Sequence, residues 1–429
     1  MLNGKTQEVE ILTLEDCLRI GIDNNLSLEG KRKEIQKSKY GVSENRSKLL
    51  PQINAIAGYN NNFDPPVSVT DGSSYGVPYN ITKTLQHSAN AGLEMQMPLF
   101  NQTLYTSMSI AKVMEEISRL SYGKAREDVI LQISKMYYLG QVTAEQIMLI
   151  KANITRLEEL RDITQAFFDN GMSMEVDLKR VNINLENLKV QYDNAQAMMK
   201  QQLNMLKYIM DYPAEKEIAL TPVNTDSITT VALTGLSENI YELQLSQSQV
   251  QLAERQKKII TNGYIPSLSL TGSWRYAAYT DKGYHWFHSG PSNQWFRSYG
   301  VGLTLRIPIF DGLDKTYKIK KAMIDIENKR LAWEDARKNL QTQYLNAVND
   351  LMNNQRNFKK QKDNYLLAED VYAVTSDRYR EGIASMTEVL QDEMQMSEAQ
   401  NNYISAHYNY RVTNLMLLKL TGQIESLVK

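Results

Sequence analysis

Residue types that support metal binding or nucleophilic catalysis are few in this chain and widely spaced. The sequence has one cysteine, Cys17, so it has neither an intrachain disulfide nor a cluster of thiolate ligands. The four histidines are His87, His285, His288 and His407. His285 and His288 could share a metal ion, but they lie in a loop that offers no fixed spacing and no third ligand is evident. Ordinary loop residues are the better interpretation.

Motifs for catalysis are also missing from the sequence. It contains no phosphate-binding loop, no dinucleotide fingerprint and no nucleophile elbow. We therefore expect no enzyme, no bound metal and no cofactor. A formal net charge of −1 gives no electrostatic reason to expect nucleic-acid binding, and 42% hydrophobic residues argue against disorder. The sequence contains no run of 18 apolar residues, so it predicts no transmembrane helix. Residues 1–6 lack the pattern of a secretory signal.

The elements that must position any site occur twice along the chain. Corresponding residues, about 210 to 215 positions apart, are Pro51 and Pro266, Pro98 and Pro308, and Gly171 and Gly382. Each half reads helix, proline, strand, long loop, strand, proline, very long helix, glycine turn and helix. We expect a first repeat over residues 1–211, a linker with a short strand over 212–236, and a second repeat over 237–429.

Long helices are predicted where proline is excluded. All ten prolines lie outside residues 99–212 and 309–429, and apolar residues recur there at steps of three and four. Helices over 101–168 and 312–379 would each be about 100 Å long at 1.5 Å per residue. Each ends at a glycine of the kind that stops helices, which predicts hairpins with tips at Gly171 and Gly382. The remaining predicted helices span 14–48, 174–210, 237–261 and 387–420.

Four segments alternate apolar and polar residues and are predicted to be strands. They span about 53–63, 85–98, 267–280 and 294–309. Period two over ten or more residues indicates one apolar and one polar face. A soluble half-buried sheet is one interpretation. The strand length, the aromatic residues near the strand ends and the long polar connections over 64–84 and 281–293 favour strands that span an outer membrane. The aromatic residues are Trp274, Tyr276, Tyr279, Trp295 and Tyr299.

Four strands cannot close a barrel, and open edges in lipid would leave backbone groups unpaired. We therefore expect the chain to oligomerise, and eight, twelve or sixteen strands remain open on these grounds. The fold class we predict is mainly α with a membrane β-barrel portion. The alternative function is a non-transporting coiled-coil scaffold or fibre, which would have no need of strands with a lipid-facing parity.

The ordered, duplicated pattern resembles the TolC family of outer membrane efflux proteins over essentially the whole chain. The resemblance rests on residues 12–18 followed by Asp23-Asn24-Asn25-Leu26, on the two Leu/Ile-Pro junctions, and on Pro-Leu/Ile-Phe after the second strands. It implies a homotrimer with one twelve-stranded barrel and a periplasmic helical tunnel. The implied function is the passive exit duct of a tripartite efflux pump or a type I secretion system. The implied partners are a periplasmic adaptor (membrane fusion) protein, an inner-membrane pump and outer-membrane lipid, for an exported protein whose signal is absent from this sequence.

The resemblance also assigns roles near the hairpin tips. Glu388 and Asp177 lie six residues beyond Gly382 and Gly171, where family members carry acidic residues that line a constriction of the tunnel. The alternative is that both are solvated charges on a helix face with no role in a constriction. Gly171, Met172, Gly382 and Ile383 would form the tips that meet the adaptor. The chain departs from the family pattern at Gln391 and Arg180, where a second acidic residue is usual, and at Ala384, where some members carry a basic residue that locks the closed state.

Overall fold

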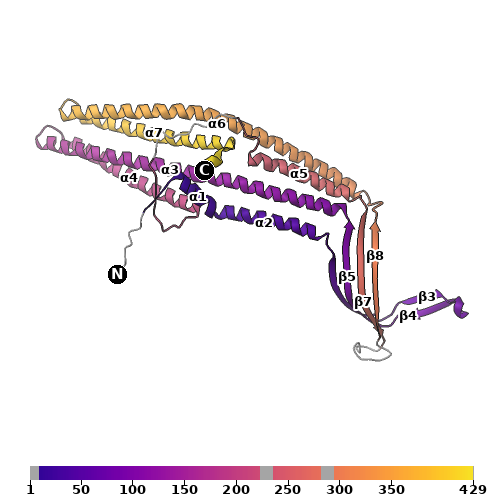
Figure 1. Ribbon diagram of the computed structural model, residues 1–429. Coiled ribbons are helices and arrows are strands. Elements are labelled where there is room, and N and C mark those ends of the chain that lie inside the picture. Colours follow the sequence, from indigo (N-terminus) through magenta and orange to yellow (C-terminus); the bar gives the residue numbers. More distant parts are fainter. Residues whose placement is uncertain (1–8, 223–234, 282–293, 429) are drawn as a thin grey trace, which may run out of the picture. The chain divides into compact units, whose positions relative to one another are not determined.

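The computed structural model describes residues 9–222, 235–281 and 294–428, and the expected order of elements recurs in both halves (Figure 1). The first half contains β1 (Glu10–Leu12), α1 (Leu14–Asn24), α2 (Leu26–Ser47), β2 (Gln52–Asn61), β3 (Val67–Asp71), η1 (Ser73–Tyr75), β4 (Tyr79–Lys83), β5 (His87–Phe100), α3 (Gln102–Asp169) and α4 (Glu175–Met210). Then follow β6 (Ile218–Leu220), α5 (Tyr241–Asn262), β7 (Ser267–Thr280), β8 (Trp295–Arg306), α6 (Asp314–Arg380), α7 (Met386–Leu420) and η3 (Ile424–Val428).

The chain divides into two compact units, and each unit draws on both sequence repeats. The sheet unit consists of residues 36–117 and 248–330, and the helical unit consists of residues 1–35, 118–247 and 331–429. The sequence repeat therefore does not correspond to a division into two separately packed bodies. Instead, equivalent parts of the two repeats pack together within each unit.

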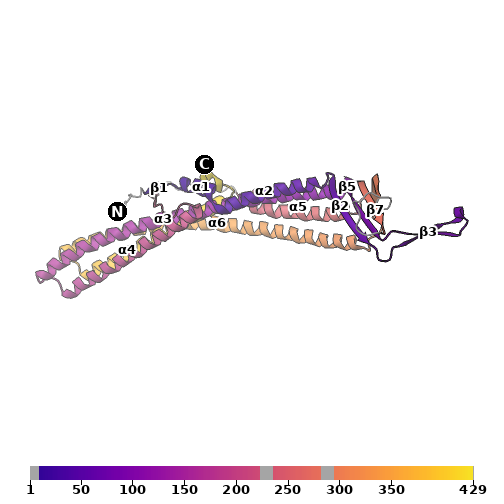
Figure 2. The same cartoon turned by 90° about the horizontal axis from the view of Figure 1, so that it is seen from below.

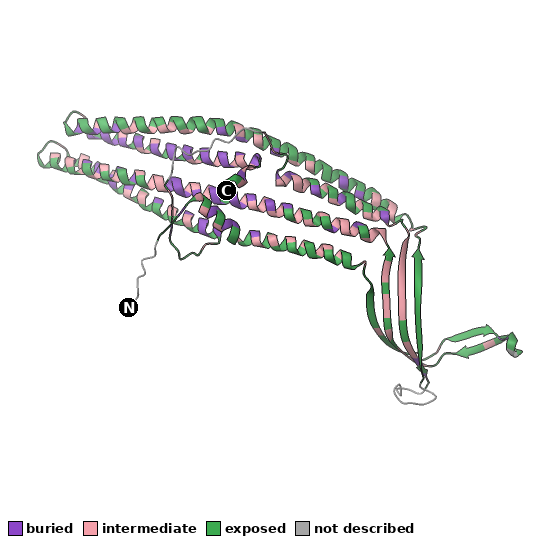
Figure 3. Cartoon of the chain, in the orientation of Figure 1, coloured by how far each residue is buried: buried purple, intermediate pink, exposed green. Residues whose placement is uncertain are grey.

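The sheet unit is built on four antiparallel strands in the order β2-β5-β7-β8. Each repeat supplies one antiparallel pair, and β5 of the first repeat joins β7 of the second over the whole length of both strands. The outer strands β2 and β8 are hydrogen-bonded on one side each and are almost entirely exposed. Figure 3 shows this gradient, with more burial in the inner strands than in β8. The sheet thus has two open edges.

The helical unit contains two helical hairpins, formed by residues 118–169 of α3 with α4 and by residues 331–380 of α6 with α7 (Figures 1 and 2). Burial is concentrated on α7, whereas α6 is largely exposed (Figure 3). An apolar cluster joins α1 to α3 and α4, and Cys17 and Tyr137 lie within it. The hydroxyl group of Tyr137 lies 2.5 Å from the hydroxyl of Thr221 and donates to the carbonyl of Leu12 at 3.3 Å, which ties the short parallel pair β1 and β6 to α3.

Four features differ from the sequence-based expectation. The helix predicted over 14–48 is broken at Asn25, whose side-chain oxygen accepts from the amide of Leu28 and so caps α2. The connection over 64–84 contains the hairpin β3–β4 rather than only turns. The strand β1, paired with β6 in the linker, was not predicted. The strand β8 ends at Arg306, before Pro308, whereas β5 continues past Pro98 with a register shift between Pro98 and Phe100.

Replacing two glycines by alanine should change stability in opposite directions. A Cβ atom would meet nothing within 4 Å at either Gly30 or Gly382, but Gly382 has a φ of 76°. Gly382→Ala should therefore destabilise the fold by about 1 kcal/mol, because the left-handed conformation disfavours a Cβ. Gly30→Ala should stabilise it by roughly 0.5–1 kcal/mol, because alanine loses less backbone entropy in a helix.

Thermal unfolding followed by circular dichroism measures both effects. Each variant serves as the control for the other, since both add one methyl group in open space. A lower midpoint for Gly30→Ala, or an unchanged midpoint for Gly382→Ala, would contradict the expectation.

Candidate functional site

Both hairpin tips are built on the same helix-stop motif. Gly171 and Gly382 adopt φ values of 75° and 76°, as the sequence pattern indicates. At the first tip the amide of Met172 donates to the carbonyl of Phe167 at 2.7 Å, and at the second the amide of Ile383 donates to Arg378 at 2.8 Å. The side chains that follow the glycines are exposed, Met172 to 68% and Ile383 to 62%. The tips therefore present apolar side chains to the surroundings.

Glu388 has a structural role in addition to its charge. Its carboxylate oxygen Oε2 accepts from the backbone amide of Ser385 at 2.8 Å, while the Ser385 hydroxyl accepts from the backbone amide of Glu388 at 3.3 Å. This reciprocal capping box begins α7. The hydrogen bonds from the Ser385 backbone and hydroxyl lower the pKa of Glu388, which keeps it ionised. Serine three residues before glutamate is the sequence signal for such a cap, and our sequence-based interpretation did not use it.

Asp177 is linked to the second hairpin through Arg180. One guanidinium nitrogen of Arg180 lies 3.3 Å from the Asp177 carboxylate and donates to the hydroxyl of Thr387, also at 3.3 Å. Thr387 directly precedes Glu388. The structure thus brings α4 and α7 together next to the two predicted acidic residues. The Asp177 side chain is only 15% exposed, and its charge is compensated by Arg180.

An apolar cluster behind the tips holds the two hairpins side by side. It contains residues of α3, α4, α6 and α7, among them Leu157, Leu185, Tyr379 and Val389. Buried polar contacts cross the same interface. The amide of Asn153 donates to the side-chain oxygen of Gln400 at 2.7 Å. These contacts fix the relative height of α3 and α7, because a shift along the helix axis would leave buried amides unpaired.

The sheet has one apolar and one polar face, as the alternation predicts. The register aligns Ala55 with Leu93, Leu93 with Trp274 and Trp274 with Tyr299, so the apolar side is continuous across the strands. Leu303 and Leu305 of the edge strand extend it and are 66% and 61% exposed. The opposite side carries Asn54, Gln96, Thr271, Ser273, Gly300 and Gly302, which with Glu94 and Arg275 line a hollow of about 490 Å³.

The aromatic residues are distributed differently from a pair of rings at the strand ends. Trp274 and Tyr299 face each other well inside their strands rather than at the ends. Trp274 contacts Tyr276, with ring centroids 5.6 Å apart. Tyr279 has the parity of the polar face. Only Trp295 begins a strand on the apolar side.

His87, His407 and Cys17 are engaged in hydrogen bonds or buried in the fold. His87 shares a 2.8 Å hydrogen bond with the hydroxyl of Tyr59. His407 is fully buried and accepts from Arg411 at 2.9 Å. Burial raises the pKa of the Cys17 thiol to about 12, which suppresses its nucleophilicity. His285 and His288 lie outside the described residues. Among the residues that the structure describes, no group of three acidic, histidine or cysteine side chains could hold a metal ion.

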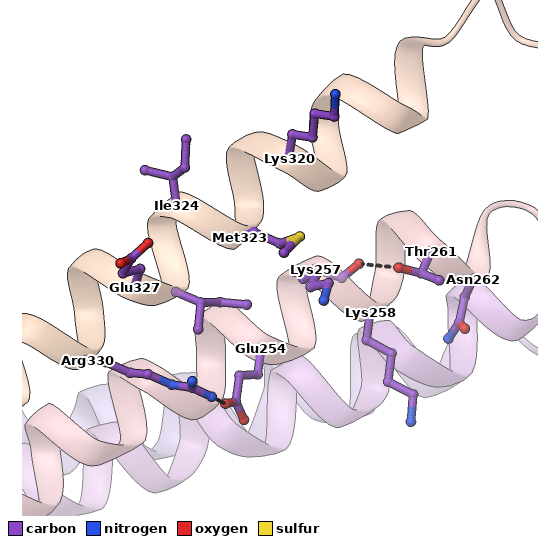
Figure 4. Close-up of a pocket in the computed structure, with 11 residues that line it drawn as sticks. Glu254, Lys257, Lys258, Thr261, Asn262, Lys320, Met323, Ile324, Glu327 and Arg330 are labelled. Atoms are coloured by element: carbon purple, nitrogen blue, oxygen red, sulfur yellow. Dashed lines mark hydrogen bonds and ion pairs between the residues drawn. The ribbon is translucent and has the colours of Figure 1, made fainter.

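A groove between α5 and α6 in the sheet unit has a volume of about 960 Å³ (Figure 4). Lys257, Lys258 and Lys320 give it a basic rim, and Met323 lies on its α6 side. At one end, Arg330 and Glu254 form an ion pair of 2.8 Å. It is a furrow on the surface between the two helices.

Comparisons with known proteins agree with this architecture. A model of the family described as "Outer membrane efflux protein" matches residues 20–210 and again residues 232–423. The outer membrane protein TolC of Vibrio cholerae is 21% identical over 399 residues, which cover 89% of this chain and 84% of TolC. No helix among the described residues is both long and apolar enough to cross a membrane.

Two solved structures show the same fold at low sequence identity. CusC superimposes with a TM-score of 0.79 at 16% identity, covering 95% of this chain and 91% of CusC. The outer-membrane channel OprN superimposes with a TM-score of 0.77 at 14% identity, covering 95% and 89% of the two chains. The duplicated family match and these folds confirm the resemblance inferred from the sequence. The chain belongs to the outer membrane efflux protein family, and it is a channel-tunnel through which an efflux system opens at the outer membrane of a Gram-negative bacterium.

Proposed function

We propose that three copies of this chain close one barrel of twelve strands, with β8 of each copy paired to β2 of the next. The observation that carries this proposal is a four-stranded sheet with a continuous apolar face and two exposed edges. In lipid the unpaired amides and carbonyls of both edges must find partners. A head-to-tail contact that closes into a ring satisfies them. Two or four copies would also do so, and the family resemblance supports three.

In this assembly the two faces of the sheet have different surroundings. The apolar face, with Leu93, Trp274 and Leu303, contacts lipid. The polar face, with Thr271, Ser273 and Gly302, lines the water-filled path. A polar wall of this kind suits a passive duct whose transport energy comes from an inner-membrane pump.

The hairpin tips are the proposed docking surface for a periplasmic adaptor protein. Met172 and Ile383 follow the tip glycines and are exposed, as is Met174 at 67%. Methionine adapts its shape to a partner surface, and exposed apolar residues at a defined tip are typical of interaction sites. Domain boundaries near residues 211 and 237 fit this assignment, since each repeat then contributes one complete hairpin.

Glu388 and Asp177 are the proposed charges of the periplasmic constriction. Each lies in the first turn of the helix that follows a tip, and Arg180 connects the two regions. Three copies would bring three Glu388 carboxylates to the same height. A ring of like charges raises the local concentration of counter-ions and favours cations. Asp177 contributes less, because Arg180 offsets its charge.

The first prediction from the proposed function concerns assembly. In detergent the protein should have three times the 49.2 kDa mass of one chain, and it should precipitate or aggregate when detergent is removed. Native mass spectrometry or light scattering measures this. A stable monomer would contradict the closed barrel. A water-soluble oligomer would favour the scaffold alternative.

The second prediction tests the two faces of β8. Leu303→Arg and Leu305→Arg should each reduce assembly, because an arginine in hydrocarbon costs roughly 2–4 kcal/mol near the midplane and less toward either interface. Thr304→Arg is the matched control, since its side chain has the parity of the polar face. The readout is the yield of folded oligomer in lipid vesicles. Equal yields for all three variants would mean that the apolar face does not contact lipid.

The third prediction separates the charge of Glu388 from its capping role. Glu388→Gln keeps an oxygen for the Ser385 amide but removes the charge, whereas Ser385→Ala removes the hydroxyl of the cap but leaves the charge. In planar bilayers Glu388→Gln should reduce selectivity for cations, and Ser385→Ala should leave it unchanged. Unaltered selectivity in Glu388→Gln would reduce this residue to a helix cap.

Hydrogen exchange gives the complementary readout for the same variants. Exchange at the start of α7 should be faster in Ser385→Ala than in Glu388→Gln. The cap also depends on pH, because the folded pKa of Glu388 lies below its unfolded value. Its contribution is therefore present above the unfolded pKa and is lost as the pH falls through the folded pKa.

A further inference from the structure

The polar face of the sheet carries one ion pair in the middle of its wall. Glu94 lies on β5 and Arg275 on β7, and their side chains form a salt bridge. In the register, Glu94 is opposite Ser273, and Arg275 is opposite Gly92. The two charges are therefore diagonal neighbours on one face, a geometry that long side chains can bridge. Glu94 lies at the middle of its 14-residue strand.

Gly92 makes room for this pair. A Cβ atom at position 92 would lie 2.8 Å from the Cα and 2.9 Å from the Cγ of Arg275, and 2.4 Å from the carbonyl oxygen of Trp274. Any larger residue would collide with the stem of the arginine. The glycine lets Arg275 lie close against β5, next to the carboxylate two residues away.

The rest of the wall at this height is uncharged. The hollow around the pair is lined by Asn54, Gln96, Thr271, Ser273 and two glycines of β8. Within the described strands, the other charged residue with the parity of this face is Arg306, at the very end of β8. Both members of the pair remain accessible, with 40% of Glu94 and 47% of Arg275 exposed.

We propose that Glu94 and Arg275 balance the charge of the channel wall, so that its membrane section admits anionic, cationic and zwitterionic solutes alike. The proposal rests on the function proposed above, in which the polar face lines the water path. Selection by charge is then confined to the tips and to Arg306 at the end of β8. A solute that carries both signs, such as an amphiphilic zwitterion, meets one partner for each charge in every copy. Because each charge is paired with the other, neither retains a solute of the opposite charge.

Elementary electrostatics gives the size of the effect that the pair suppresses. Twelve strands about 4.8 Å apart and tilted by about 40° close on a backbone radius of about 12 Å. Three uncompensated unit charges about 10 Å from the axis, with a Debye length of about 10 Å at 0.1 M salt, change the ratio of cations to anions on the axis roughly fourfold. At 1 M salt the Debye length is about 3 Å, and the effect should vanish.

The test is the reversal potential of single channels in a salt gradient. Glu94→Gln leaves three arginines and should shift selectivity toward anions roughly fourfold at 0.1 M salt. Arg275→Gln should shift it toward cations by a similar factor. The double variant should match the wild type. Arg297→Gln is the control, because Arg297 has the parity of the apolar face and should cause no shift.

One further variant keeps the test decisive if the single neutral variants do not assemble. Thr271→Glu leaves the pair intact and adds one carboxylate to the same wall, so it should shift selectivity toward cations as Arg275→Gln does. Unchanged selectivity in Thr271→Glu, or in both single variants of the pair, would overturn the proposal.

Labelling distinguishes failure of this proposal from failure of the proposed function. Ser273→Cys should react in membranes with a charged thiol reagent, whereas Leu303→Cys should not, and the native Cys17 is fully buried. Reaction at position 273 with unchanged selectivity in the pair variants would reject charge balancing and leave the duct intact. Protection at position 273 would reject both together.

Discussion

The proposed assembly depends on backbone hydrogen bonding at the two open edges of a four-stranded sheet. An isolated edge in water is a liability that proteins cover or charge, but in hydrocarbon it has no solvent partner at all. The exposed strands β2 and β8 carry no helix or loop of their own unit that pairs with them in the described part of the chain. The continuous apolar face removes the alternative of leaving the sheet in water. In the proposed assembly, association and membrane insertion are two consequences of one requirement.

The hairpins answer a different constraint, which is specificity between long helices. Apolar seams alone leave the axial register of such helices loosely defined, because one turn resembles the next. The buried pair Asn153–Gln400 favours one register, because a shift would leave buried amides unpaired. Polar contacts inside an apolar interface serve this purpose in coiled coils at some cost in stability. The contact from Arg180 to Thr387 joins the same two hairpins at an exposed position near the tips.

Much of the fold could be predicted from local signals. Proline exclusion and the two glycines located α3, α4, α6 and α7 to within a few residues, and alternation located the four strands of the main sheet. Features that depend on distant contacts were missed. Asn25 interrupts the first helix while its side-chain amide donates to the carbonyl of Ile209, far away in sequence. The pair β1–β6 is three residues long, too short for periodicity to register.

The candidate site shows the same division between local and distant information. The capping box at Ser385 was readable from the sequence, because serine and glutamate are three residues apart. The bridge by Arg180 and the ion pair of Glu94 with Arg275 were not, since each requires the register of two elements. Family resemblance supplied positions for Glu388 and Asp177, and the structure adds which groups contact them.

The pairing of β5 with β7 has a consequence for how the proposed barrel tolerates substitutions. It joins the second strand of one repeat to the first strand of the next, which is the same kind of joint that β8 and the following β2 would make between copies. The chain would thus make the same kind of strand pairing twice, once within one chain and once between two copies. Substitutions that weaken the pairing within the chain destabilise each subunit at any protein concentration. Substitutions that weaken the pairing between copies can be compensated by mass action, so substitutions in β2 and β8 should be tolerated better when expression is high.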